Sequence, residues 1–125
     1  MLTEIRTQNA PGAVGPFSQA IQVGNLLFVS GQLPIDPTTG EFASDDAVAQ
    51  AEQCLQNLTA IAEAAGTDLS KTVKTTVLLT DLGKFAEINT VYARFFAEPY
   101  PARACYEVSA LPKGAKVEIE AIIAI

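Results

Sequence analysis

The fold is indicated most clearly by two stretches, Pro101-Ala102-Arg103-Ala104-Cys105-Tyr106-Glu107 and Val117-Glu118-Ile119-Glu120. Side chains alternate between the two faces of a β-strand, so each stretch, if extended, has one polar and one apolar face. The polar faces carry Arg103, Cys105 and Glu107 in the first stretch and Glu118 and Glu120 in the second. If the two strands pair, we expect their apolar faces, with Tyr106 among them, to form one core surface. The opposite surface then gathers a guanidinium, a thiol and carboxylates, which suffices for carboxylate binding and acid–base chemistry.

The earlier part of the chain alternates between strand and helix patterns. Residues 20–23 and 26–30 flank the turn Gly24-Asn25 and predict a β-hairpin, and residues 2–7 are a weaker strand candidate. Apolar residues recur at helical spacing from the possible N-caps at 44–46 to Ala65, before Gly66, and again over residues 83–96. Residues 72–80 alternate and predict a strand. On that strand we expect one face to hold Val73, Thr75, Val77 and Leu79.

The order of these elements, ββ(β)-α-β-α-ββ, predicts an α+β (mixed α/β) single domain over residues 1–125. We expect both helices to cover one face of one sheet. The other face then has no cover, although it carries Leu78, Ile122 and Ala124. A small domain seldom leaves such a surface in water, so we expect a homo-oligomer with sites at its subunit junctions.

Composition excludes several classes of function. The 125 residues include 8 basic and 14 acidic side chains, and a net charge of −6 argues against binding to a nucleic acid backbone. Histidine is absent, which removes Ser-His-Asp and Cys-His mechanisms and the usual zinc ligand sets. Cys54 and Cys105 do not make a disulfide framework, and we expect two reduced thiols. Without a leader or a long apolar run, we expect a cytoplasmic protein and no membrane partner.

Motifs along the whole chain closely resemble the RidA family of reactive intermediate deaminases, also called YjgF/YER057c/UK114. The front motifs are Gly15-Pro16-Phe17-Ser18-Gln19 and Ser30-Gly31-Gln32, and the end motifs are Pro101-Ala102-Arg103-Ala104-Cys105 and Val117-Glu118-Ile119. The resemblance implies a chorismate-mutase-like fold, a homotrimer and pockets between adjacent subunits. It also implies detoxification by hydrolysis of 2-imino acids, which form from enamines such as 2-aminoacrylate, to 2-keto acids and ammonia. No metal or organic cofactor is expected.

The resemblance also implies roles for individual residues. Arg103 matches the arginine that holds the substrate carboxylate, Glu118 the carboxylate that orients water, and Cys105 a position whose backbone contacts the substrate or water. Four further positions match substrate-binding residues, namely Phe17, Ser30, Gly31 and Asn89. Many family members have tyrosine where this chain has Phe17. The missing phenol is therefore expected to affect substrate preference and rate.

Residue spacing alone leaves alternatives open. Arg103 could form an ion pair with Glu118 or Glu120 across the sheet, the Cys105 thiol could be an ordinary packed side chain, and Asn89 could tie a helix to a loop. Three function classes stay open as well. The first is an imine deaminase, and the second is a non-enzymatic regulator that binds small carboxylates or keto acids in the same pocket. The third is an endoribonuclease, a class weakened by the negative charge and the absence of histidine.

Overall fold

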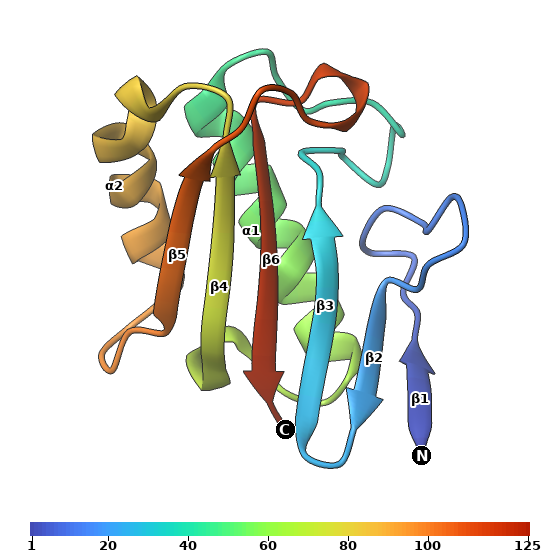
Figure 1. The fold of residues 1–125 in the computed structure, drawn as a ribbon. Coiled ribbons are helices and arrows are strands. Elements are labelled where there is room, and N and C mark those ends of the chain that lie inside the picture. The colour runs from blue at the N-terminus through green and yellow to red at the C-terminus, as the bar shows by residue number, and fades with distance from the viewer.

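The computed structural model describes residues 1–125 as a six-stranded sheet with two α-helices (Figure 1). The strands are β1 (Leu2–Ile5), β2 (Ala20–Val23), β3 (Leu26–Gln32), β4 (Thr72–Leu79), β5 (Ala102–Glu107) and β6 (Val117–Ala124), and the helices are α1 (Ala47–Ala64) and α2 (Phe85–Phe95). The strand order is β1-β2-β3-β6-β4-β5, and all neighbours are antiparallel except β4 and β5. The predicted element order and the mixed α+β class are confirmed.

Local sequence signals explain where the elements begin and end. The β2–β3 hairpin turns at Gly24, whose φ of 57° lies in the left-handed region that glycine adopts without strain. Helix α1 begins after Asp46, whose carboxylate accepts a hydrogen bond from the Ala49 amide at 2.9 Å. Asp81 caps the short 3₁₀ turn before α2 in the same way, through the Gly83 amide. The sequence predicted these polar and glycine boundaries.

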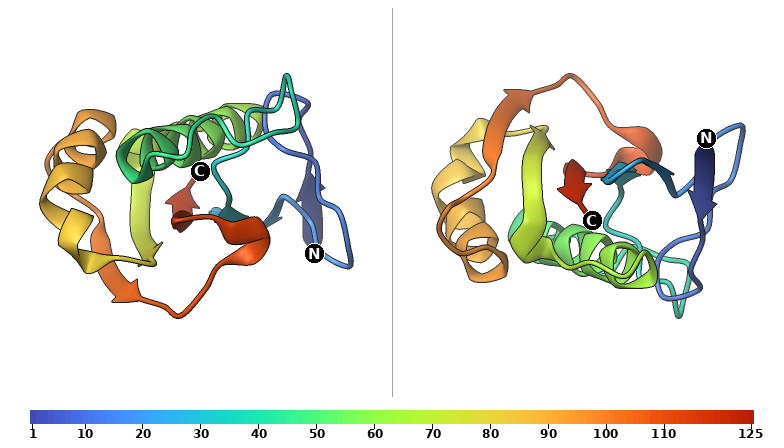
Figure 2. Two further views of the ribbon diagram at one scale, coloured as in Figure 1. Left: turned by 90° about the horizontal axis from the view of Figure 1, so that it is seen from above. Right: turned by 90° about the horizontal axis from the view of Figure 1, so that it is seen from below.

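Both helices lie on the same side of the sheet, as the end-on views show (Figure 2). The inward face of β6 packs there, with Val117, Ile119, Ala121 and Ile123 all buried. These side chains share one core with the inward face of α1, which includes Cys54, Leu55, Leu58 and Ile61. The apolar face expected from the alternation in β6 and the one expected from the helical spacing in α1 therefore pack together in the core. Neither α1 nor α2 has the length and apolar character of a membrane-spanning helix.

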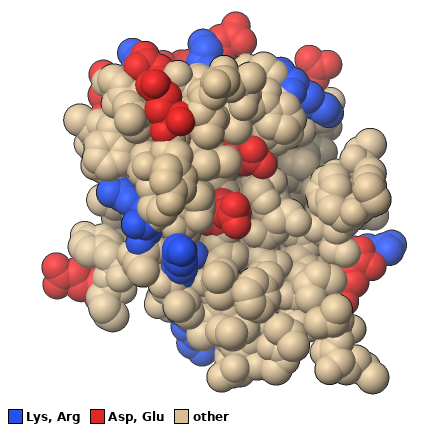
Figure 3. Space-filling view, viewed as in Figure 1, with Lys and Arg blue, Asp and Glu red and all other residues tan.

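The opposite face of the sheet carries no helix, as predicted. We call it the open face. Phe28 of β3 and Tyr106 of β5 lie on it with 42% and 57% of their surface exposed, and Leu78 and Ile122 are half-buried there. Figure 3 shows this side of the molecule: its middle is mostly uncharged, with acidic side chains near the centre. Exposed apolar side chains gathered on one uncovered face are typical of a surface that binds another protein chain.

Two details of the strand predictions were wrong, and the pairing on which a third depended does not occur. β5 does not pair with β6, because β4 lies between them. The faces of β5 are also reversed: Arg103 and Cys105 project toward the helices, and Tyr106 lies on the open face rather than in the core. The reason is that α2 offers aromatic rings on which a guanidinium can stack. Val73 is 49% exposed because a register shift between Thr72 and Lys74 interrupts the alternation of β4.

Candidate active site

A cleft of about 450 Å³ opens beside the end of β3 and the start of β6. Four of the residues predicted for the site line it, Phe17, Ser30, Gly31 and Glu118. Its walls also come from three loops, through Pro11, Gly12, Val14, Leu33, Ile35, Pro112 and Lys113. A cleft of this size can hold a small organic acid and ordered water.

A β-bulge shapes the floor of this cleft. Val29 pairs with Ala121 and Gln32 pairs with Ile119, so two residues of β3, Ser30 and Gly31, stand opposite one residue of β6. Bulges of this kind redirect side chains and are frequent beside active sites. Here the bulge brings the Gly31 backbone against the Glu118 side chain, because a Cβ at Gly31 would lie 2.9 Å from Glu118 Cδ. Gly31 is thus required for close approach and not for a turn.

The Glu118 carboxyl group is half-buried in the cleft. Burial raises the pKa of this carboxyl above its ordinary value, and the negative charge of nearby Glu120 raises the pKa further. Neither glutamate forms an ion pair in the structure, whose two ion pairs are Arg6–Glu4 and Arg94–Glu52. A carboxylate with a raised pKa beside a cleft is suited to accept and return a proton.

Ser30 is held by the loop that precedes β2. Its hydroxyl donates to the Ser18 carbonyl at 2.6 Å, and its amide donates to the Gln19 carbonyl at 2.9 Å. Ser30 therefore hydrogen-bonds to backbone carbonyls of the preceding loop, as a serine at a strand end can. It also lines the cleft. The same bonds place the segment that carries Phe17 against the bulge. Phe17 itself is 53% exposed at the cleft wall.

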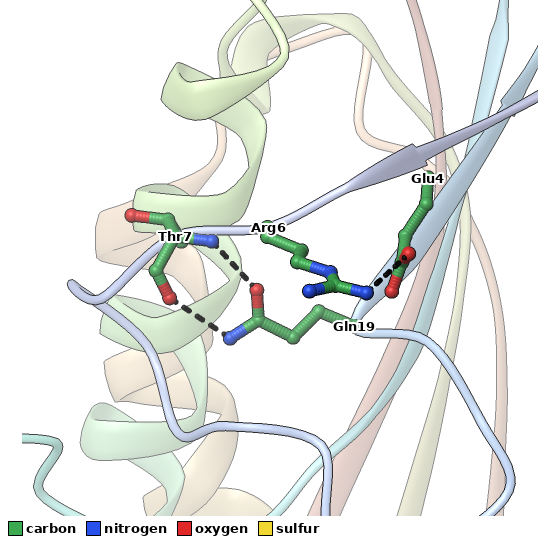
Figure 4. Close-up of polar contacts among 4 residues, drawn as sticks. All are labelled: Glu4, Arg6, Thr7 and Gln19. Carbon is green, nitrogen blue, oxygen red and sulfur yellow. Dashed lines mark hydrogen bonds and ion pairs between the residues drawn. The ribbon is translucent and has the colours of Figure 1, made fainter.

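Gln19 is a positioning residue that neither residue spacing nor periodicity indicates. Its buried side-chain carbonyl accepts from the Thr7 amide at 2.8 Å, and its NH₂ group donates to the carbonyls of Thr7, Ala10 and Pro11 at 3.0, 3.4 and 2.8 Å. Figure 4 shows this amide reaching back to Thr7 beside the exposed Arg6–Glu4 ion pair. One buried amide thus fixes the loop that forms a cleft wall. In the sequence, only the position of Gln19 within the front motif pointed to this residue.

Asn57 of α1 secures another wall of the cleft. Its buried side-chain NH₂ group donates to the carbonyls of Leu33 and Ile35 at 3.1 and 3.0 Å, and its side-chain carbonyl accepts from Gln53. Leu33 and Ile35 belong to the loop after β3 and line the cleft. A buried polar residue within an apolar helical stripe was the available signal, because such an amide needs partners.

A second cluster surrounds Arg103, and none of its residues lines the cleft. Arg103 Nη1 donates to Asn89 Oδ1 of α2 at 2.7 Å. Arg103 Cζ also lies 4.8 Å from the centre of the Tyr92 ring and 5.2 Å from that of Phe85. Asn89 therefore binds the arginine rather than a loop. The two rings and Asn89 hold the exposed guanidinium in place, and its other N–H donors remain free to bind a planar carboxylate.

Cys105 lies next to this cluster and packs against the core. Burial raises the pKa of its thiol, although the Arg103 charge acts in the opposite direction. Such a thiol is a poor nucleophile at neutral pH, which favours the interpretation of Cys105 as a packed side chain. Cys54 is fully buried in the core, and both cysteines are free. No group of three or more acidic or cysteine side chains forms a metal site.

The two clusters lie on opposite faces of one sheet. Arg103 pairs in register with Thr75 of β4, which is 1% exposed and faces the helices. Glu118 pairs with Leu78, three residues further along β4 and therefore on the open face. The ion pair considered between Arg103 and Glu118 is thus absent, and one chain does not bring these two residues to one substrate.

Comparisons with known proteins agree with the resemblance seen in the motifs. A family model described as Endoribonuclease L-PSP matches residues 7–125. The chain is 78% identical over 125 residues to the RutC family protein y4sK of Sinorhizobium fredii, covering 100% of this chain and 99% of that protein. It is 50% identical over 125 residues to the 2-iminobutanoate/2-iminopropanoate deaminase of Escherichia coli, covering 98% of this chain and 97% of that protein.

The fold gives the same assignment. The crystal structure of RidA from an Antarctic Psychrobacter matches with a TM-score of 0.95 and 52% identity, covering 98% of this chain and 99% of that chain. Sequence identity and fold therefore agree over nearly all of both proteins. The chain belongs to the RidA family, which the matching family model describes as Endoribonuclease L-PSP.

Proposed function

We propose that this protein hydrolyses small 2-imino acids, such as 2-iminobutanoate and 2-iminopropanoate, to 2-keto acids and ammonia. The observation that carries the proposal is a pair of complementary clusters. One is a guanidinium already stacked and hydrogen-bonded for a carboxylate, at Arg103. The other is a cleft-lining carboxyl with a raised pKa, at Glu118. The name of the Escherichia coli relative supports the same reaction.

We propose further that the two clusters meet between copies of the chain, as subunits of a homotrimer. Within one copy they point away from each other across the sheet. The open face carries exposed apolar side chains such as Phe28 and Tyr106 and no covering element, so a second copy docked there would bury them and could bring its own Arg103 to the cleft. Each site would then take Phe17, Ser30, Gly31 and Glu118 from one copy, and Arg103, Asn89 and Cys105 from the next.

The proposed reaction follows from this geometry. Arg103 holds the substrate carboxylate and thereby fixes the imine carbon relative to the cleft. A water molecule beside Glu118 attacks that carbon, and Glu118 accepts a proton from it. Glu118 returns this proton to the nitrogen, giving a tetrahedral adduct with one hydroxyl and one amino group. The adduct then collapses: the hydroxyl proton passes to the nitrogen, the carbonyl forms, the C–N bond breaks and ammonia leaves. Free imines already hydrolyse, so positioning and acid–base assistance of ~10²–10⁴-fold would be sufficient.

A coupled assay tests this function. A threonine dehydratase with threonine generates the enamine and imine continuously, and lactate dehydrogenase with NADH reports the 2-keto acid. We expect the protein to accelerate keto-acid release. Arg103→Ala should abolish the acceleration, whereas Arg94→Ala, a matched loss of an exposed arginine on α2 outside both clusters, should retain it.

Two other results would contradict the proposal. Saturable binding of 2-oxobutyrate without any acceleration by the wild type would identify a carboxylate-binding regulator. Cleavage of RNA that persists in repurified Arg103→Ala protein, with no effect on imines, would favour the endoribonuclease named by the family model.

A further inference from the structure

We infer that Tyr92, anchored by Thr75, is a positioning residue that holds the Arg103 guanidinium ready for a carboxylate. The inference rests on the proposed role of Arg103 as the group that binds the substrate carboxylate. Tyr92 does not line the cleft, and we assign it no contact with the substrate.

The Tyr92 ring forms a fixed platform under an otherwise exposed side chain. Tyr92 is 6% exposed, and Arg103 Cζ lies 4.8 Å from the centre of its ring. A guanidinium over an aromatic face is held by cation–π attraction, which is strongest where water is excluded from the ring. Asn89 fixes one end of the same guanidinium at 2.7 Å, so the group is held by its plane and by an edge.

Thr75 keeps this platform in place. Its hydroxyl lies 2.6 Å from the Tyr92 hydroxyl in a buried hydrogen bond. Thr75 is also the residue of β4 that pairs in register with Arg103 of β5. The strand residue beside the arginine thus anchors the ring over which the arginine lies. Burial raises the pKa of Tyr92, so its hydroxyl remains protonated and available for this bond at neutral pH.

This arrangement removes rotational freedom from Arg103 before the substrate arrives. A long exposed arginine samples many rotamers, and ordering it on binding weakens affinity. Without the platform we expect the KM for the imine and the Kd for 2-oxobutyrate to rise by roughly 3- to 30-fold, the range that a cation–π contact supports. The value of kcat should change little, because the ring is remote from the reacting atoms.

The experiment compares Tyr92→Leu with Tyr92→Phe and with Phe96→Leu. Tyr92→Phe keeps the ring and should raise KM clearly less than Tyr92→Leu does. Phe96→Leu removes the ring that stacks on Tyr92 at 4.6 Å but is not one of the two rings beside Arg103, so it controls for general loosening of α2. Tyr92→Leu should show the full loss of affinity. In 2-oxobutyrate binding, combining Tyr92→Leu with Arg103→Ala should weaken affinity no further than Arg103→Ala alone, because the Tyr92 change acts through the arginine.

A readout independent of activity separates this inference from the proposed function. Proton exchange at the Arg103 Nε–H group, followed by ¹⁵N NMR, should be faster in Tyr92→Leu than in the wild type or Phe96→Leu. If the wild type does not hydrolyse imines, the proposed function fails while this measurement still tests the positioning. If Tyr92→Leu does not fold, Phe85→Leu removes the other ring under Arg103 and serves in its place. Unchanged exchange and unchanged KM in the folded variant would overturn the inference.

Discussion

The Glu118 side chain lies so close to the backbone of Gly31 that no other residue fits at position 31 without displacing it. A Cβ built there would stand 2.9 Å from Glu118 Cδ and 3.2 Å from Cγ. The bulge in β3 creates this approach, because it sets Ser30 and Gly31 opposite a single residue of β6. The position of the proposed catalytic carboxylate is therefore determined by the absence of a side chain on the neighbouring strand.

Gly31→Ala should impair activity far more than Gly12→Ala. The new methyl group must push the Glu118 carboxyl out of place, which we expect to lower kcat/KM by at least ~10-fold, since small misplacements of catalytic groups reduce rates steeply. Gly12 lines the same cleft, but a methyl group added there would meet no heavy atom within 4 Å, so its alanine variant is the matched control. The coupled dehydratase assay measures both. Equal rates for the two variants would contradict the role given to this contact.

Activity should decline as the pH falls through the raised pKa of Glu118. Protonated Glu118 cannot accept a proton, so the acid limb of kcat/KM should lie above the ordinary glutamate pKa of about 4.3. Glu120→Gln removes the neighbouring negative charge that contributes to this shift, and should move the limb to lower pH without changing the plateau. Glu63→Gln on the exposed surface of α1 should leave the profile unchanged. An acid limb at or below the ordinary glutamate pKa of about 4.3 in the wild type would contradict the assignment of Glu118, with its raised pKa, as the titrating group.

Two inactive variants should complement each other if the site is shared between copies. Arg103→Ala retains the Glu118 cluster, and Glu118→Gln retains the Arg103 cluster. Co-expression in equal amounts should recover about one quarter of wild-type activity, because random assembly pairs two intact clusters in about a quarter of the junctions. As a control for dilution, the wild type is co-expressed with the double variant that carries both changes. Failure of the purified mixed oligomer to recover activity would show that the two clusters do not serve one site.

Gln19→Ala should destabilise the protein and loosen the cleft wall. The change leaves the Thr7 amide and the carbonyls of Ala10 and Pro11 without their side-chain partner. We expect a loss of about 1–3 kcal/mol in the free energy of unfolding, measured with urea. Gln22→Ala removes a glutamine of the same strand region whose only side-chain bond is a 3.5 Å contact with Gly24, and should cost less. If the Gln19→Ala protein were as stable as the Gln22→Ala protein, the Gln19 side chain would not hold the loop through these hydrogen bonds.

Phe17→Tyr should raise activity modestly. Phe17 lines the cleft and is half-exposed, so a hydroxyl can be added without disturbing the core. One new hydrogen bond to the substrate or its water is worth about 0.5–1.5 kcal/mol, which corresponds to roughly a 2- to 12-fold gain in kcat/KM. The comparison uses the coupled assay with 2-iminobutanoate as substrate, and Phe17→Leu reports the contribution of the ring itself. A loss of activity in Phe17→Tyr would show that the cleft wall excludes a polar group.

Most of the fold could be predicted from the sequence because its signals are local. The alternation in β6 and the helical stripe of α1 each describe one element and its buried side. Polar caps such as Asp46 and Asp81 lie next to the helical turns that they begin. Periodicity failed at β5, an edge strand whose covered side depends on the helix packed against it. Alternation showed that Arg103 and Tyr106 lie on opposite faces, but not which face meets α2.

The candidate site was predictable only as a set of residues. The family motifs identified Arg103, Glu118, Phe17, Ser30, Gly31 and Asn89, and the cleft gathers four of them. Gln19 and Asn57 were missed because they act by hydrogen bonding to loop carbonyl groups, which only the folded chain brings within reach of their side chains. The sequence does not show which groups will form hydrogen bonds with a given polar side chain.

The sequence by itself determined the order of the elements, the family and the residue types available for chemistry. Tertiary structure alone decided that β4 lies between β5 and β6, with Thr75 beside Arg103 and Leu78 beside Glu118. These two neighbours are three residues apart on β4, and side chains an odd number of residues apart on a regular strand point to opposite faces. Strand order and register arise from contacts between distant segments, which no local pattern encodes, and they separate the proposed carboxylate-binding group from the proposed base.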